Sequence, residues 1–325
     1  MRVPNQERAR EAVTFAQTHN VRPSVEDRVR ICLVAVDCQN TFCIPGFELF
    51  VSGRSGTGAV EDTVRLCEFI YRNMELITEI DVTMDTHRAF QIFHPVFWVN
   101  EHGDSPDPMT VITVEHVQRG VWKVNPAIAG KADKNLGEMQ RYALHYVQEL
   151  SDRNKYELTI WPYHALLGGI GHALVSSLEE AVFFHSLARG SEGRFEIKGR
   201  NALTEHYSVL SPEVLTDEQG NRIAEKNVGL IDELLAFDAV VIAGQAKSHC
   251  VAWTIDNLLD EVQKRDARLA KKVYLLEDCT TPVVVPGVVD FTEQADAEFQ
   301  RFAHAGMNVV QSTDPIQTWP GMSLD

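Results

Sequence analysis

Residues 239–265 read AVVIAGQAKSHCVAWTIDNLLDEVQKR, and this stretch decides the fold. The first six residues form an apolar run rich in β-branched side chains, which predicts a strand buried on both faces. Apolar positions at helical spacing then predict a helix over residues 248–265. A buried strand that leads directly into such a helix is typical of a parallel sheet covered by helices.

The same alternation runs through most of the chain. Further strands are predicted at residues 30–36, 80–84, 156–161, 194–199, 271–277 and 307–312. Helices are predicted at residues 58–74, 171–187, 224–236 and 291–306. About six strands that alternate with helices predict an α/β fold with three α/β/α layers around a mostly parallel six-stranded sheet, because right-handed crossovers bring successive strands into parallel order.

Residues 26–325 are expected to form a single domain, preceded by a helical extension at residues 1–25. The segment 97–155 does not follow the strand–helix rhythm. It contains two candidate strands that could pair, at residues 110–117 and 120–124, and a helical pattern at 134–150. We interpret it as an insertion that forms a lid or an oligomer contact, with a separate domain as the alternative.

The composition excludes several kinds of partner. The formal net charge of −16 disfavours nucleic acid and anionic membrane, because both repel an acidic surface. No apolar run approaches the roughly 20 residues that span a bilayer. The N-terminal residues lack the apolar centre of a secretory signal, so a cytoplasmic location and reduced thiols for the six cysteines are expected.

Polar residues follow several of the predicted strands. In parallel α/β sheets, ligands bind outside the carboxyl ends of the strands, so these residues are expected to lie together. The set comprises Asp37, Asp85, His87, His164, Lys198 and Cys250.

Three members of the set suit nucleophilic catalysis. Cys250 begins the helix after the strongest strand, where backbone N–H groups and the helix end favour a thiolate, and Lys198 could lower the thiol pKa further. The carboxylate of Asp37 could accept the thiol proton. A buried structural cysteine and an Asp that caps a turn are the alternatives that position alone leaves open.

Asp85 and His87 lie two residues apart, on one side of an extended strand end. A carboxylate and an imidazole in this arrangement suit a divalent metal such as Zn, with Fe and Mn as alternatives. His164 could complete the set, and His94 is a possible fourth ligand. An ordinary core or surface histidine is the competing interpretation for His94.

Five motifs in order resemble the nicotinamidases and the wider isochorismatase-like cysteine hydrolases. They are VDCQNTF, DTH, WPYH, KGRNALTEHYS and GQAKSHCV, and the resemblance covers roughly residues 30–310. It implies a metal-containing amidohydrolase whose substrate is nicotinamide or a related small amide.

The resemblance also implies roles. Asp37 would be the general base, Lys198 the supporting cation, and Cys250 the nucleophile that forms a thioester and releases ammonia. The N–H groups of Ala246 and Cys250 would form the oxyanion hole, beside a cis peptide between Gln245 and Ala246. The metal would be held by Asp85, His87 and His164, and a flat substrate ring would be flanked by Phe42 and Trp161. The family often assembles, so a homo-oligomer is expected.

The chain also departs from the family pattern. Thr41 replaces an Asp, CIPGFELF replaces a Gly-Gly loop, Ala165 replaces a Cys, and Lys247-Ser248 replaces a Thr-Asp pair. Lys247 would add a positive charge near the site, so a larger or differently charged amide is compatible with these changes. Two alternatives are an isochorismatase-type hydrolase of another small substrate and a catalytically silent binding protein.

Overall fold

A single parallel sheet forms the centre of the fold. The computed structural model describes residues 3–130, 134–153 and 155–324; residues 1–2 of the expected extension, 131–133 and 154 of the expected insertion, and 325 lie outside the described residues. Within that part, the main sheet has six strands, all parallel, in the order β12-β9-β8-β1-β2-β7. Their bounds are Asn308–Val310, Val273–Leu276, Ala239–Gly244, Ile31–Val36, Glu79–Asp85 and Phe195–Lys198.

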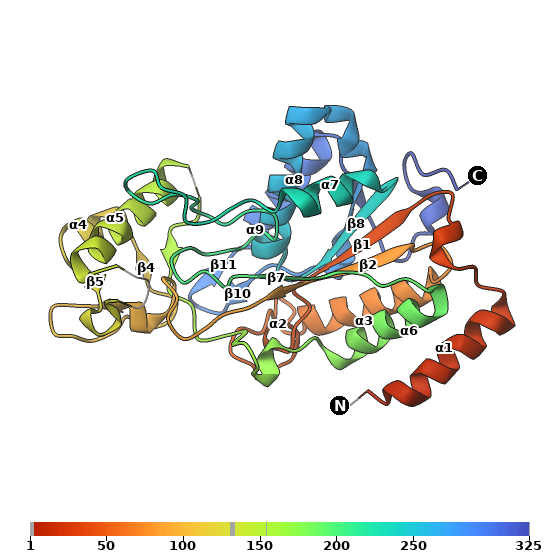
Figure 1. Cartoon of the computed structure of the whole chain (residues 1–325), viewed down its shortest axis with the longest axis horizontal. Helices are drawn as coiled ribbons and strands as arrows, with labels where there is room; N and C mark the ends of the chain where they lie inside the picture. The colour runs from red at the N-terminus through yellow and green to blue at the C-terminus, as the bar shows by residue number, and fades with distance from the viewer. Residues whose placement is uncertain (1–2, 131–133, 154, 325) are drawn as a thin grey trace.

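Helices cover both faces of this sheet (Figure 1). On one face lie α3 (Gly58–Arg72) and α6 (Ser176–Arg189), and on the other lie α7 (Val228–Ala236), α8 (Ala252–Arg265) and α9 (Thr292–His304). Every residue of β1 and β8 is buried, since both faces of these strands are covered. The three-layer α/β/α prediction is therefore confirmed.

The N-terminal helix α1 (Asn5–His19) packs against α6 on the outside of the first layer (Figure 1). Phe15 meets Phe184 with a ring-centroid separation of 5.6 Å, and Arg8 pairs with Glu180 at 2.5 Å. The predicted helical extension therefore rests on the domain rather than projecting from it. None of the helices in the described ranges has the length and apolar character that crossing a membrane requires.

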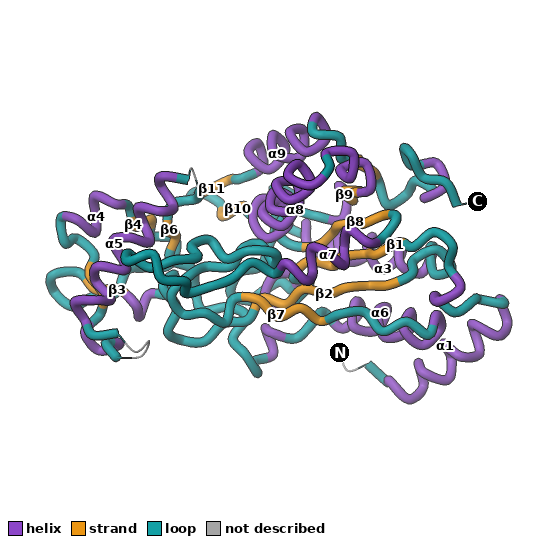
Figure 2. Tube along the Cα trace, turned by 45° about the horizontal axis from the view of Figure 1, so that its top comes forward, coloured by secondary structure: helices purple, strands orange, loops and turns teal. Residues whose placement is uncertain are grey.

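The segment 97–155 lies at one end of the molecule, on the left in Figure 2. Its elements are β3 (Trp98–Val99), β4 (Val111–Ile112), α4 (Val114–Gln118), β5 (Lys123–Val124) and α5 (Leu136–Asp152). Short elements elsewhere in the described ranges include α2 (Asn40–Cys43), β6 (Leu158–Thr159), β10 (Val284–Val285) and β11 (Val289–Asp290). The interpretation of the segment 97–155 as a lid or oligomer contact stays a prediction.

The structure corrects two strand predictions in this region. The predicted strand at 156–161 is reduced to β6, which pairs with β4 outside the central sheet. The two candidate strands at 110–117 and 120–124 do not pair with each other, because β5 pairs with β3. Thr113 and His116 cap one another's backbone N–H groups, and this reciprocal cap makes residues 114–118 a helix instead of a strand.

Candidate active site

The sheet reverses its direction of winding between β1 and β8. From β1 the chain adds β2 and β7 on one side and β8, β9 and β12 on the other. Connections that leave two such neighbouring strands in opposite directions open a crevice at their carboxyl ends. Asp37 directly follows β1, and Cys250 lies in the turn after β8. The two residues therefore face the crevice from its two sides.

Lys198, the last residue of β7, contacts both of these residues. Its Nζ lies 2.9 Å from Oδ2 of Asp37 and 3.5 Å from Sγ of Cys250. Nζ also lies 3.1 Å from Oδ1 of Asp85 and donates to the carbonyl oxygen of His206 at 2.8 Å. Asp85 and Lys198 are paired residues in the β2–β7 ladder, so the register of the sheet sets their contact. The structure thus brings the predicted trio together and joins it to a predicted metal ligand.

Asp37 is fully buried and is held by Thr83 of β2. The Thr83 hydroxyl donates to Oδ1 of Asp37 at 2.5 Å, and the backbone N–H of Asp37 donates to the Thr83 carbonyl at 3.2 Å. Burial raises the pKa of Asp37 despite the neighbouring Lys198, and the charge of Asp85 adds to the rise. Asp37 is consequently a stronger base than an ordinary Asp.

The ammonium group of Lys198 lies between two carboxylates. Burial opposes its charge, but the attraction of Asp37 and Asp85 outweighs burial and holds the pKa of Lys198 well above its usual value. Lys198 therefore remains charged at neutral pH, with two acids sharing one cation.

The turn that carries Cys250 is anchored to β1 and to α3. Gly244 has a φ of +115°, and a Cβ there would lie 2.1 Å from the carbonyl oxygen of Val36, so the position requires glycine. The Gln245 side chain donates to Oδ2 of Asp62 at 2.8 Å, and its backbone N–H donates to the Val36 carbonyl at 2.8 Å. The peptide bond between Gln245 and Ala246 is cis, which confirms what the resemblance implied.

Cys250 itself lies in a π-helical turn, Lys247–Val251, that precedes α8. Burial and the charges of Asp37 and Asp85 raise the pKa of the Cys250 thiol well above its usual range. Lys198 lowers the thiol pKa, as expected, but burial and the two carboxylates outweigh it, so the thiol form is favoured in the resting site. Cys250 is a thiol at neutral pH, and it needs a base to become a nucleophile.

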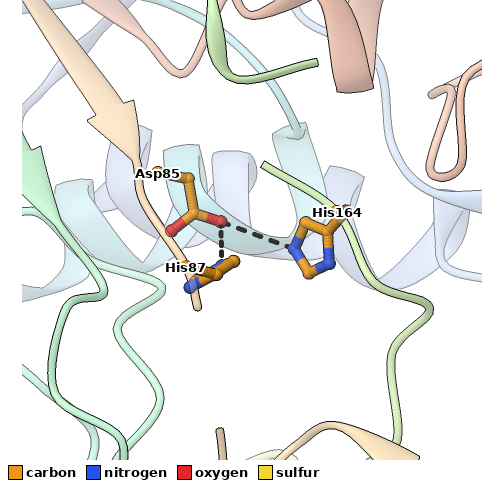
Figure 3. Close-up of side chains that lie close together, drawn as sticks. All are labelled: Asp85, His87 and His164. Carbon is orange, nitrogen blue, oxygen red and sulfur yellow. Dashed lines mark hydrogen bonds and ion pairs between the residues drawn. The ribbon is translucent and has the colours of Figure 1, made fainter. Parts of the chain in front are cut away.

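The three predicted metal ligands lie together beside this trio, as Figure 3 shows. One ligand atom from each of Asp85, His87 and His164 lies within 4.8 Å of the others. Oδ2 of Asp85 is 2.7 Å from Nε2 of His87 and 3.5 Å from Nε2 of His164. Burial works against the ionised form of Asp85, but the neighbouring His87 and Lys198 outweigh burial and hold the pKa of Asp85 well below its usual value. A buried carboxylate with two imidazoles is a donor set that suits Zn or a similar divalent ion.

The backbone of Gly199 supports the ring of His87. The Gly199 carbonyl lies 3.3 Å from Nδ1 of His87 and accepts a hydrogen bond from the Gln91 side chain at 2.7 Å. A hydrogen on Nδ1 that is donated to this carbonyl leaves Nε2 to bind a metal, and metal-binding histidines usually donate their other ring N–H in this way. Gly199 has a φ of +84°, and a Cβ there would lie 2.8 Å from Oδ1 of Asp85. The site therefore requires glycine here.

His94, the possible fourth ligand, is buried next to the other three. Its ring centroid lies 5.9 Å from that of His87 and 6.1 Å from that of His164. Nδ1 of His94 bonds to the carbonyl of Ala89 at 3.1 Å, whereas Nε2 is buried without a hydrogen-bond partner among the described residues. An unpartnered imidazole nitrogen fits a metal ligand, but His94 is not part of the closer group of three.

His164 reaches the site from a loop rather than from a strand of the central sheet. Residues after β6 run beside the end of β2, where the His87 N–H donates to the Ala165 carbonyl at 3.0 Å and the Leu167 N–H donates to the His87 carbonyl at 3.0 Å. This backbone pairing replaces the strand that the sequence predicted at 156–161, and it places His164 next to His87.

A pocket of about 440 Å³, including its mouth, opens onto the trio and the metal ligands. Phe42 and Trp161 both line it, as predicted, and both are buried. The ring of Phe42 meets the edge of the His164 ring at 5.6 Å, and Nε1 of Trp161 donates to the Tyr207 hydroxyl at 3.1 Å. The exposed lining of the pocket is therefore mainly apolar, with a few polar groups among its aromatic residues, which suits a small flat molecule.

Several pocket residues were not singled out from the sequence. They are Leu49, Val51, Glu205, His206, Tyr207, His249 and Val283. The sequence offered a signal for four of them, because Glu205, His206 and Tyr207 lie in the KGRNALTEHYS motif with Lys198, and His249 lies in the GQAKSHCV motif with Cys250. Leu49 lies in the segment CIPGFELF, which departs from the family pattern, and Val51 directly follows it, so neither gave such a signal.

Lys247 does not add a free charge to the pocket. Its Nζ lies 2.7 Å from Oδ1 of Asp296 and 3.3 Å from Oε1 of Glu277, over the ring of Phe299. It is not among the residues that line the pocket. The expectation that Lys247 affects substrate charge is therefore corrected: two carboxylates hold its ammonium group elsewhere.

Comparison with known proteins supports the fold. No family model matches the chain, and no curated protein matches its sequence. Among solved structures it is similar to the nicotinamidase/pyrazinamidase of Acinetobacter baumanii, with 20% identity, a TM-score of 0.50, and coverage of 88% of this chain and 97% of that one. It is also similar to the yeast nicotinamidase bound to the inhibitor nicotinaldehyde, with 20% identity, a TM-score of 0.53, and coverage of 86% and 99%. The chain therefore has the isochorismatase-like fold of the nicotinamidases.

Proposed function

We propose that this chain is a metal-containing cysteine amidohydrolase that converts nicotinamide or a related small amide to the carboxylate and ammonia. The observation that carries the proposal is the contact of one ammonium group, Lys198, with a buried acid, a buried thiol and a carboxylate of the candidate metal site. Structural ion pairs rarely include a thiol and a pair of unmatched acids, whereas nucleophilic catalysis uses such a set.

The geometry supports a stepwise reaction. Asp37 takes the proton of the Cys250 thiol, and Sγ attacks the amide carbon to give a tetrahedral intermediate. Asp37 then returns the proton to the leaving nitrogen, and ammonia departs as the thioester forms. Water attacks the thioester carbon while Asp37 accepts a proton, and the carboxylic acid leaves with the thiol restored. The raised pKa of Asp37 suits a group that both accepts and returns a proton.

Lys198 and the turn before Cys250 assist this sequence. The ammonium charge of Lys198, 3.5 Å from Sγ, stabilises the thiolate at the moment it forms. The backbone N–H of Ala246, which borders the pocket, makes no hydrogen bond within the described part of the chain. It is available, together with the N–H of Cys250, to hold the oxyanion of the intermediate.

A divalent ion held by Asp85, His87 and His164, with His94 as a possible fourth ligand, would act as a Lewis acid that binds the ring nitrogen of the substrate. The chain's own residues supply the rest of the binding. Phe42 and Trp161 border the space proposed for a flat ring, and Cys250 lines the same pocket, where it could reach the carbonyl of a bound amide.

The test is ammonia release from nicotinamide by the wild type and by Cys250→Ala. We expect release by the wild type and a loss of at least about 10⁴-fold in the variant, because removal of a nucleophile leaves only binding and oxyanion stabilisation. Circular dichroism and thermal unfolding of the variant check that the fold is retained. Equal turnover by the two proteins would refute the proposal.

The same assay separates the alternatives. An isochorismatase-type hydrolase would release no ammonia from any amide, and its activity would survive Cys250→Ala. A silent binding protein would release none and would show no reaction of Cys250 with a thiol reagent. Neither alternative accounts for the contact of Cys250 with Lys198 beside a base.

A further inference from the structure

His206 has a tautomer that the backbone determines. The N–H of Gly199 donates a hydrogen bond to Nδ1 of His206 at 3.0 Å. A backbone N–H can only donate, so Nδ1 is the acceptor and the hydrogen of the neutral ring resides on Nε2. A protonated ring would carry a second hydrogen on Nδ1, facing the Gly199 N–H, so this contact requires the neutral ring. Nε2–H of His206 is therefore a fixed donor.

This donor has no partner of its own. No hydrogen bond to Nε2 of His206 is made within the described ranges of the chain. The residue lines the pocket beside Asp85, His87 and Cys250. The ring edge that carries Nε2 is the one turned away from Gly199. A donor of fixed position on the wall of a largely apolar pocket is the kind of group that sets ligand orientation and specificity.

The charges around the pocket define the acceptor that this donor would meet. Of the described residues that line it, none is Lys or Arg, and two, Asp85 and Glu205, carry carboxyl groups. Lys198 is not among the residues that line the pocket, and it is already paired with Asp37 and Asp85. An anionic ring substituent would meet no free cation of the chain there, so the matching acceptor is a neutral atom such as a ring nitrogen or an oxo oxygen.

We propose that His206 is a specificity-determining residue whose Nε2–H donates to an uncharged acceptor on the substrate ring. The site then selects heteroaromatic primary amides with two acceptors. One is the ring nitrogen that a metal held by Asp85, His87 and His164 would bind, and the other accepts from His206. This inference rests on the proposed amidohydrolase function and deepens it, because it names a substrate class that the trio and the metal ligands do not define.

Two substitutions of His206 separate its proposed hydrogen bond to the substrate from its hydrogen bond to the backbone of Gly199. In His206→Asn, the side-chain oxygen replaces Nδ1 as acceptor for the Gly199 N–H, and the pocket donor is lost. In His206→Gln, the amide nitrogen replaces Nε2 as pocket donor, and the acceptor for Gly199 is lost. His145→Asn is the control, since His145 lies on α5 and bonds to the Thr216 carbonyl at 3.0 Å, outside the pocket.

The readout is the selectivity among amides that differ by one acceptor. Nicotinamide is compared with pyrazinecarboxamide, pyrimidine-5-carboxamide and pyridazine-4-carboxamide, which keep the ring nitrogen of nicotinamide and place a second acceptor at different ring positions. For each probe, kcat/KM from ammonia release is divided by that for nicotinamide, so general losses of activity cancel. We expect at least one probe to be preferred by the wild type, with a preference that falls about tenfold in His206→Asn, the effect of one hydrogen bond. His206→Gln and His145→Asn should retain it.

Three results would overturn the inference. Equal selectivity in the wild type and His206→Asn for all three probes would show that the His206 ring donates to no acceptor of the substrate. Loss of the preference in His206→Gln with retention in His206→Asn would assign His206 to backbone support alone. Absence of Cys250-dependent ammonia release from every probe would remove the proposed function and this inference together, whereas turnover of nicotinamide with unchanged selectivity would remove only the inference.

Discussion

Two buried charge clusters lie at opposite ends of β1 and β2, and they are built in opposite ways. At the amino ends, Arg189 donates to both carboxylate oxygens of Asp27, at 2.6 and 2.5 Å. Thr78 donates to the same carboxylate at 2.8 Å and accepts from the Ile31 N–H at 2.9 Å. Arg189 also donates to the carbonyl of Arg22. Here one acid meets one base, and their hydrogen bonds are made.

At the carboxyl ends, two acids share one base. Asp37 and Asp85 both contact Lys198, the Cys250 thiol lies beside them, and Nε2 of His94 has no partner among the described residues. Buried charges that are matched stabilise a fold or at least leave it intact, whereas unmatched ones are retained only where chemistry needs them. The comparison therefore separates a structural cluster from a catalytic one by the balance of their charges.

The largest effect is expected when Asp37 is neutralised, and this change tests whether the cluster at the carboxyl ends is catalytic. Asp37→Asn should lower kcat/KM for amide hydrolysis by at least about 10³-fold, because the thiol loses its base. Since burial raises the pKa of Asp37, its ionised form is less favourable in the folded than in the unfolded chain, so the free energy of unfolding at pH 7 should not fall. Denaturant titration measures the stability, and a marked loss would place Asp37 with the structural cluster.

An Asp→Asn change in the cluster at the amino ends should lower stability and leave activity unchanged. Asp27→Asn leaves the buried guanidinium of Arg189 without its carboxylate and should cost about 3 kcal/mol of unfolding free energy or more, with amide hydrolysis unchanged in the remaining folded protein. Asp266→Asn, which breaks an exposed pair with Arg268, is the matched control and should change neither property. An Asp27 variant as stable as the wild type would contradict the assignment.

Metal binding sharpens the description of the catalytic cluster. The wild type should bind one zinc ion per chain, and His164→Ala should weaken its affinity by at least about 100-fold, since even the loss of a residue that only supports a ligand costs about 10- to 100-fold. Competition with a chromophoric chelator measures both values. His145→Ala should bind zinc like the wild type. An unchanged affinity in the His164 variant would exclude the group of three as the metal site.

The smallest effect concerns His185, which lies near the structural cluster and bonds to the Ile77 carbonyl at 2.9 Å. Burial lowers its pKa from 6.5 to about 4, so its neutral form is favoured by folding. Its full contribution is present above pH 6.5 and is lost as the pH falls toward 4, which amounts to about 2 kcal/mol by pH 5. His185→Gln should therefore lose less stability than the wild type between pH 7.5 and pH 5. Parallel losses in the two proteins would contradict this.

Much of the site was predictable because parallel strands bring their carboxyl ends to one edge. Asp37, Asp85, Lys198 and Cys250 each end or follow a strand of the central sheet, so their meeting required only the right strand count and direction. His164 was predicted as a ligand for a partly wrong reason, since it is brought in by a loop paired to the end of β2 and not by a strand of the sheet.

The sequence by itself determined the buried strands, the helices that cover them and the residues with reactive side chains, because hydrophobic periodicity and residue chemistry are local properties. The tertiary structure alone decided the ionisation of Cys250, the pairing of Lys247 with Asp296 and the tautomer of His206. Each of these depends on burial and on charges or N–H groups contributed by distant segments. Neither burial depth nor such contacts can be read from residue order, and they determine what the reactive groups can do.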